Sequence, residues 1–173
     1  MRDDQTTSSF WNRLVETNAP RAVILIRIAI GLVFVSEGIQ KFLYPDARGI
    51  GRFMRIGIPA PDVMASFVGG VEIVCGALVL AGLLTRFAAI PLIITMLVAI
   101  ASTKVPILLG HGYFLFANPS VDTPGLWSML HESRTDLSML LCSCFLLVAG
   151  AGAWSFDAWF RRRPRIASSR EQP

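Results

Sequence analysis

Residues 21–41 read RAVILIRIAIGLVFVSEGIQK, an apolar run long enough to cross a lipid bilayer as one helix. A bilayer core needs about 20 such residues, because each adds about 1.5 Å along a helix. Three later runs pass the same test, at residues 63–84, 87–104 and 135–153. Helix is expected for all of them, since lipid offers no partner to open strand edges. The sequence therefore predicts an all-α polytopic membrane protein, built as a four-transmembrane-helix bundle.

The overall composition agrees with a chain that is solvated by lipid. Hydrophobic residues make up 53% of the sequence and charged residues 16%, well below the share of about 25% in soluble domains. The net charge of +4 comes from basic residues that flank the apolar runs, which is a pattern of membrane topology and not a nucleic-acid footprint. The lipid bilayer is thus the expected partner, and nucleic acid is excluded.

The chain divides into three parts around these runs. We expect a cytoplasmic N-terminal segment at residues 1–20, a membrane domain at 21–160 and a basic cytoplasmic tail at 161–173. The N-terminal segment reads either as a short helix in the membrane interface or as an ordinary tail. The longest connection, residues 105–133, is oily and broken by prolines, so it is either a lid over the outer mouth of the bundle or a loop that packs at the outer leaflet.

The distribution of lysine and arginine predicts the orientation in the membrane. Four crossings would leave both ends of the chain on one side, and that side collects most of the basic residues. Such residues are enriched in cytoplasmic segments of membrane proteins. Both termini are therefore expected in the cytoplasm, with the 105–133 connection on the outer side.

Ionisable side chains inside the first two runs are the strongest candidates for a functional site. They form an expected intramembrane polar network of Arg27, Glu37, Lys41 and Glu72. A charge at mid-bilayer costs about 2.5 to 3.5 kcal/mol, so each should face protein and have a partner. We expect Glu72 to pair with Arg27, and Glu37 with Lys41 one helical turn away. Such a network either accepts protons or ligands, or fixes the register of the two helices.

A second polar group is expected at the outer mouth of the bundle. It comprises His131, Glu132, Arg134 and Asp136 at the start of the fourth run, joined by His111 from the long connection. Acidic residues at a helix start are favoured by the helix dipole, which accounts for part of this group as capping. The spacing of the two histidines matches no standard metal site, so no metal is expected.

The sequence shows no group within the chain that could itself carry redox chemistry. The two histidines lie outside the apolar runs, so the axial ligands of a buried haem are absent. Cys142 and Cys144 are two residues apart, about 200° around a helix, and cannot grip one metal ion together. No cofactor held by the chain itself is therefore expected.

Five stretches together resemble the DoxX/DoxD-like family of membrane proteins. They are RIAIGLVFVSEGIQKF at 27–42, VEIVCGALVLAGLLTR at 71–86, HGYF at 111–114, HESRTD at 131–136 and GAGAWSFD at 150–157. The resemblance covers about residues 21–160 and implies a four-helix bundle in a bacterial cytoplasmic (inner) membrane. Certain members are subunits of thiosulfate:quinone oxidoreductases, and others are linked to membrane complexes that handle oxidative stress.

The resemblance implies a place in a membrane redox system. We expect an accessory subunit that contacts a quinone and docks a redox-enzyme partner, more than an enzyme in its own right. Two other hypotheses stay open. A proton-coupled or small-molecule transporter would use Arg27 and Glu72 in its path and would need a homo-oligomer, because one chain supplies few helices. A structural or assembly factor would use the same charges as packing contacts.

Overall fold

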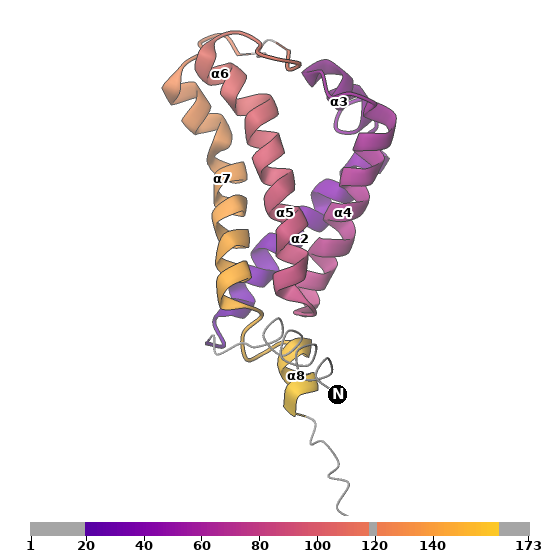
Figure 1. Ribbon diagram of the computed structural model, residues 1–173, viewed down its shortest axis with the longest axis vertical. Helices are drawn as coiled ribbons and strands as arrows, with labels where there is room; N and C mark the ends of the chain where they lie inside the picture. The colour runs from indigo at the N-terminus through magenta and orange to yellow at the C-terminus, as the bar shows by residue number, and fades with distance from the viewer. Residues whose placement is uncertain (1–19, 118–120, 163–173) are drawn as a thin grey trace, which may run out of the picture.

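The computed structural model describes residues 20–117 and 121–162, and these residues form a helical bundle (Figure 1). Most of the expected N-terminal segment and basic tail lies outside the described residues. Helices make up the regular structure of the described part, with one isolated bridge between Tyr113 and Phe116. In chain order the elements are α2 (Val23–Leu43), α3 (Ile50–Ile56), α4 (Pro61–Ala81), α5 (Thr85–Ala99), the π-helix η1 (Ile100–Lys104), α6 (Val105–Leu109), α7 (Leu126–Ala149) and α8 (Phe156–Arg162).

The prediction of an all-α membrane protein is confirmed by these elements. Three helical segments are long and apolar enough to cross a bilayer, at Val23–Leu43, Pro61–Ala81 and Thr85–Leu109. The last of these joins α5, η1 and α6, so the third apolar run continues past its expected end. α7 has 24 residues but carries charged residues in its first half, and it is not among the three.

α7 begins earlier than the sequence predicts. The expected start was residue 135, at the beginning of the apolar run, whereas the helix starts at Leu126, directly after Pro124 and Gly125. These two residues are a turn signal, and Gly125 has a positive φ of 138°. A search for apolar runs misses such a start, because the first turns of α7 are amphipathic. The residues expected at the helix start therefore lie well inside the helix.

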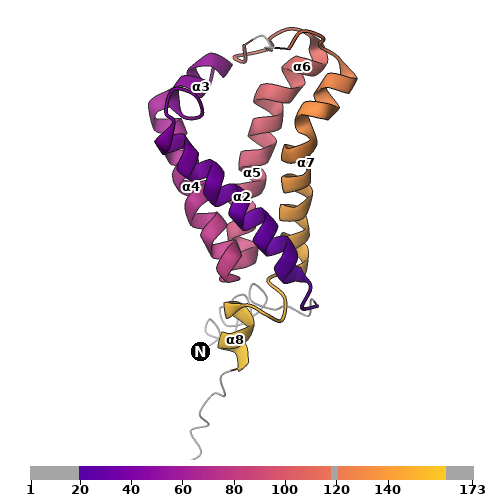
Figure 2. The same cartoon turned by 180° about the vertical axis from the view of Figure 1, so that it is seen from behind.

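The helices pair two by two, and the bundle is wider at one end than at the other. α2 makes its most extensive contact with α4, α5 makes its most extensive contact with α7, and the contact between α4 and α5 is smaller. The two pairs come together near α8 and diverge toward α3 and α6, as Figures 1 and 2 both show. The two ends of the described chain, residues 20 and 162, lie at the narrow end. The wide end is therefore the place to look for a binding site.

Glycine allows the close approach of α2 and α4. A Cβ atom added to Gly38 on α2 would lie 2.7 Å from the carbonyl oxygen of Gly69 on α4, closer than such atoms approach in proteins. A Cβ on Gly76 would lie 3.1 Å from the Cβ of Phe34. Small residues at such a crossing let two membrane helices pack backbone to backbone. This crossing sets the position of every side chain that α2 and α4 share.

Replacing Gly38 by valine should destabilise the protein, because the added methyl groups collide with the backbone of α4. Overpacking of this kind costs about 1 to 3 kcal/mol. Gly70→Val is the matched control, since nothing lies within 4 Å of a Cβ at that position. Thermal unfolding in detergent should show a clearly lower Tm for Gly38→Val than for Gly70→Val. Equal Tm values for the two variants would contradict the close crossing.

Candidate functional site

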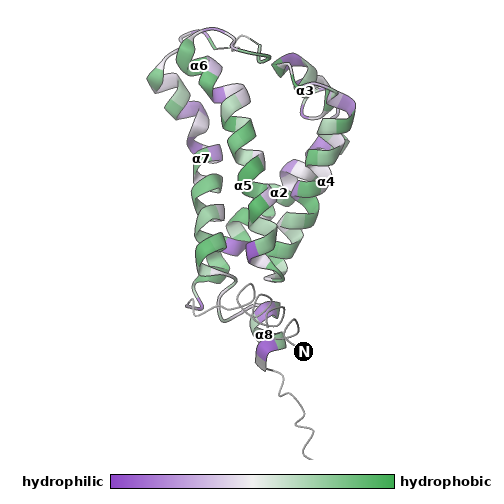
Figure 3. Cartoon of the chain, viewed as in Figure 1, coloured by the Kyte–Doolittle hydropathy of each residue, from purple (hydrophilic) through white to green (hydrophobic). Residues whose placement is uncertain are grey.

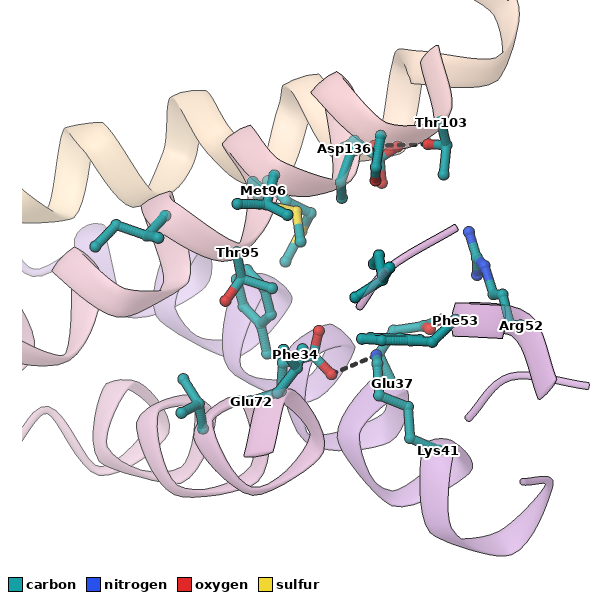
Figure 4. A pocket seen from close by; sticks show the side chains of 18 of the residues that line it. Phe34, Glu37, Lys41, Arg52, Phe53, Glu72, Thr95, Met96, Thr103 and Asp136 are labelled. Atoms are coloured by element: carbon teal, nitrogen blue, oxygen red, sulfur yellow. Dashed lines mark hydrogen bonds and ion pairs between the residues drawn. The ribbon is translucent and has the colours of Figure 1, made fainter. Parts of the chain in front are cut away.

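A cavity of about 600 Å³ lies between the helix pairs where the bundle widens. We call it the main cavity, and residues of α2, α3, α4, α5, η1 and α7 line it. Figure 4 shows part of its wall at close range. Most of the lining is apolar. Figure 3 shows that the helices around it consist mainly of hydrophobic residues. The phenylalanine and methionine side chains in the wall are Phe34, Phe53, Phe67, Met64, Met96 and Met139.

An ion pair between α2 and α4 stands in the wall of the main cavity. The Lys41 Nζ atom lies 2.5 Å from the Glu72 Oε2 atom, and the two side chains are 12% and 4% exposed. Both residues line the cavity (Figure 4). Glu37 and Arg52 are near enough to Glu72 to interact with it electrostatically. The close crossing at Gly38 brings these groups together, because it leaves little room between the two helix backbones.

A second ion pair belongs to the wall formed by η1 and α7. The Lys104 Nζ atom lies 3.3 Å from the Asp136 Oδ2 atom. Lys104 comes at the end of η1, and π-helical turns occur frequently at functional sites. Ser102 and Thr103 of the same turn also line the cavity, and so does Glu132 of α7. In Figure 4, Asp136 and Thr103 lie across the cavity from Glu72 and Lys41. The main cavity thus has charged groups on two facing walls and apolar side chains between them.

The expected pairing of Glu72 with Arg27 is wrong. The Arg27 guanidinium donates to four backbone carbonyls, those of Val79 at 2.9 Å, Leu80 at 2.7 Å, Ala151 at 3.1 Å and Trp154 at 2.6 Å. The last carbonyls of a helix have no partner within the helix, and Arg27 supplies donors to those of α4. This contact lies at the narrow end of the bundle, so Arg27 takes no part in the cavity network.

The expected pairing of Glu37 with Lys41 is also wrong. Lys41 bonds to Glu72 on the neighbouring helix, while the nearest cation to Glu37 is Arg48, with 3.7 Å between Nη1 and Oε1. Spacing along one helix cannot reveal a partner on another helix, and the short distance between α2 and α4 favours the partner across the interface. Glu37 still lines the main cavity together with Lys41 and Glu72.

Asp157, in α8, is a buried charged residue that the sequence did not single out. Its carboxylate accepts N–H bonds from Leu84 at 2.9 Å and Thr85 at 3.4 Å, so it caps the start of α5, and it is 3% exposed. Burial raises the pKa of the Asp157 carboxyl, while the two backbone N–H groups and the charge of Arg27 lower it in part. Asp157 is the last residue of the GAGAWSFD stretch. The position of this stretch directly after the last apolar run was the feature of the sequence that could have pointed to Asp157. Its role is to join α8 to the ends of α4 and α5.

The structure separates the residues expected at the outer mouth. Glu132 and Asp136 line the main cavity, whereas His131 and Arg134 lie outside it and bond to each other, with 2.6 Å between Nη1 and Nε2. His111 is exposed in the connection between α6 and α7, and its Nδ1 lies 2.8 Å from the Gly112 carbonyl. Among residues 20–117 and 121–162, no group of three metal-ligating side chains could hold a metal ion.

The described part of the connection after α6 lies over the wide end of the bundle (Figure 1). The Ala117 N–H donates to the Ile56 carbonyl of α3 at 3.2 Å, and the Gly125 N–H donates to the Ile107 carbonyl of α6 at 2.9 Å. The Tyr113 hydroxyl donates to the Ala101 carbonyl at 2.8 Å. These bonds tie the connection to both sides of the wide end.

Comparison with known proteins now gives the family. The model of the DoxX family matches residues 22–105. The "Uncharacterized membrane protein Rv3486" of Mycobacterium tuberculosis is 51% identical over 160 residues, which are 92% of this chain and 94% of that protein. The chain belongs to the DoxX family. The resemblance noted in the sequence is thereby confirmed. No solved structure matches this DoxX protein.

A second relative is similar over a shorter stretch. The "Putative oxidoreductase CatD" of Bacillus subtilis is 32% identical over 81 residues, which are 47% of this chain and 58% of that protein. The match of the DoxX family model includes Lys41, Glu72 and Lys104, three of the four residues of the two ion pairs. Asp136, on α7, lies beyond it.

Removing one member of the Lys41–Glu72 pair should destabilise the DoxX protein more than removing both. A single substitution leaves a buried charge without its partner, which costs about 3 to 5 kcal/mol, whereas an uncharged pair is close to neutral. The Tm losses of Lys41→Met and Glu72→Gln in detergent should therefore exceed the loss of the double variant. Arg27→Gln combined with Glu72→Gln is the control cycle, and its losses should add. Additive losses for the Lys41–Glu72 cycle would refute the coupling.

Proposed function

We propose that this DoxX protein binds a quinone in its main cavity and serves as an accessory subunit of a membrane redox system. The observation that carries the proposal is a largely apolar cavity of about 600 Å³ with a lysine on each of two facing walls. Sites for small ligands typically enclose about 300 to 1,000 Å³ and combine apolar walls with a few convergent polar groups. A quinone ring is apolar on its faces and has carbonyl oxygens at opposite edges.

The two lysines provide the donors that such a ligand needs. An ammonium group has three N–H donors, and the ion pairs with Glu72 and Asp136 leave further donors on Lys41 and Lys104. Each lysine is held in place by its carboxylate partner. The carboxylates are also positioned to exchange protons with a quinone that is reduced to a quinol. Phe34, Phe53 and Met96 supply the apolar surface between the two walls.

The cavity also offers a route from the lipid phase. Phe67 of α4 and Ile94 of α5 both line it, although their side chains are 63% and 56% exposed. α4 and α5 make less contact with each other than α2 and α4 do. A side chain that lines a cavity and is also exposed marks an opening, here between two membrane helices. A lipid-dissolved ligand such as a quinone would enter sideways by this opening.

We further propose that α7 completes four membrane crossings. α7 packs along α5 and returns the chain from the wide end to the narrow end, where α2 began (Figure 2). Its charged residues Glu132 and Asp136 line the main cavity, so lipid does not have to solvate them. With four crossings, the distribution of lysine and arginine favours both termini in the cytoplasm of a bacterium and the wide end at the outer side of its inner membrane.

The redox part of the proposal draws on the relatives. The relative from Bacillus subtilis carries the name "Putative oxidoreductase CatD", and the resemblance to the family implies the same association. A quinone bound here would be a mobile carrier, so an enzyme with its own cofactor must supply or accept the electrons. Transport fits the cavity less well. Ile30, Leu92 and Leu146 are at most 1% exposed and belong to a packed apolar core, which offers no polar groups to a solute.

A water-soluble quinone analogue should raise the Tm of the purified protein. A ligand that binds the folded state stabilises it by RT ln(1 + [L]/Kd), about 2.7 kcal/mol at a concentration of 100 Kd. Ala99→Phe should abolish the shift, because Ala99 lines the main cavity and the larger side chain would fill it. Ala29→Phe, at an exposed position of α2 outside the cavity, is the matched control and should keep the shift. A shift that survives Ala99→Phe would exclude binding in this cavity.

Affinity purification from native membranes in mild detergent should recover a redox enzyme with this DoxX protein. The enzyme supplies the electron transfer that an accessory subunit supports, so quinone reduction should fall when the chain is removed from those membranes. Recovery of a self-contained oligomer that moves a solute would instead support transport. If the only defect of the recovered partner in the absence of this chain is that it does not assemble, the result would support the role of assembly factor.

A further inference from the structure

A second cavity, of about 470 Å³, adjoins the main cavity at the wide end of the bundle. Its lining differs in kind, because it includes three arginines, Arg48, Arg52 and Arg55, and one acidic residue, Glu132. We call this second cavity the arginine vestibule. The two cavities adjoin, because they share lining residues. Arg48, Arg52, Ser102, Thr103 and Glu132 line both of them. A molecule of sufficient length could therefore occupy both cavities at once.

Two of the three arginines have donors to spare. Arg55 donates to the carbonyls of Asp46 at 3.0 Å and Ala47 at 3.2 Å, so it also holds the turn before α3. Arg48 lies 3.7 Å from Glu37, and both side chains of that pair are more than one third exposed. The described residues provide no hydrogen bond or ion pair to the guanidinium of Arg52, whose interaction with Glu72 is purely electrostatic. The vestibule thus presents unused guanidinium donors.

These arginines concentrate positive charge at one place in the bundle. Arg52 and Arg55 are three residues apart on α3, so they share one face of the helix and repel each other. Arg48 adds a third positive charge in the same cavity. The guanidinium group binds oxyanions through two parallel N–H bonds, and its planar fork matches the geometry of phosphate. The hydroxyl groups of Ser102 and Thr103 lie in the same wall, but both donate to the Ala99 carbonyl, so the arginines are the donors for an anion.

We propose that the arginine vestibule binds a phosphate-type oxyanion, with Arg52 as its main contact. The adjoining apolar cavity favours an anion that carries a hydrocarbon chain, because the chain could then lie along the wall of Phe53 and Ile56. An acidic phospholipid has this chemistry, and so does a free phosphate at the headgroup position. The proposal goes beyond quinone binding and does not depend on it, since an anion in the vestibule needs no redox chemistry.

The test compares an acidic phospholipid, a neutral one and inorganic phosphate. The purified protein in an uncharged detergent is titrated with phosphatidylglycerol, with phosphatidylcholine of the same chains, and separately with phosphate, and the Tm is followed. Phosphatidylglycerol should raise the Tm more than phosphatidylcholine does. Arg52→Gln should weaken its apparent affinity about tenfold, the effect expected from one charged hydrogen bond. Arg134→Gln is the matched control at the same end of the bundle, because Arg134 lines neither cavity.

The outcomes separate the sources of the anion. A Tm shift with phosphatidylglycerol alone, weakened by Arg52→Gln, supports a lipid headgroup, and an equally sensitive shift with inorganic phosphate supports a free anion. Equal shifts with both lipids, or equal weakening by Arg52→Gln and Arg134→Gln, would overturn the proposal in favour of general surface charge. If Arg52→Gln does not fold, Arg48→Gln gives the same comparison. Neither result bears on the quinone test, which uses an uncharged ligand and a variant at Ala99.

Discussion

The contact of Arg27 with the end of α4 and the turn after α7 is the constraint on which the shape of this protein depends. One guanidinium joins α2 to the last carbonyls of α4 and to the turn after α7. Asp157 acts from the other direction, because it caps α5 and interacts with Arg27. Hydrogen bonds with a charged donor or acceptor are about twice as strong as neutral ones, and here they lie away from water. The narrow end of the bundle is fixed by this contact, so the helix pairs can separate only at the wide end.

The separation of the helix pairs creates the cavity and decides which charges line it. α2 and α4 stay in contact along their length because glycines let their backbones meet, and that contact places Lys41 beside Glu72. α5 and α7 form the other pair, and η1 places Lys104 beside Asp136. Apolar side chains remain between the two pairs. A site with this arrangement favours a ligand that is apolar in its middle and polar at its edges.

The sequence predicted the helices well and their partners poorly, for a physical reason. Long apolar runs such as residues 21–41 are sufficient to predict helices in lipid, since no other structure satisfies the backbone there. Partners depend on how helices cross, and the crossing depends on contacts such as Gly38 against Gly69, which no periodicity in one helix reveals. Arg27 illustrates the limit. A search for its opposite charge pointed to Glu72, whereas backbone carbonyls satisfy it.

The same limit explains how buried charges of similar appearance in the sequence differ in role. Arg27 has its donors directed at carbonyl groups and no open space beside it, as expected of a structural contact. Lys41 and Lys104 each pair with one carboxylate and face a cavity, so part of their hydrogen-bonding capacity is left for something else. Burying an ion pair costs more in lost solvation than its attraction returns unless further bonds are made. A ligand in the main cavity would make those bonds, which is the physical reason to expect one there and none beside Arg27.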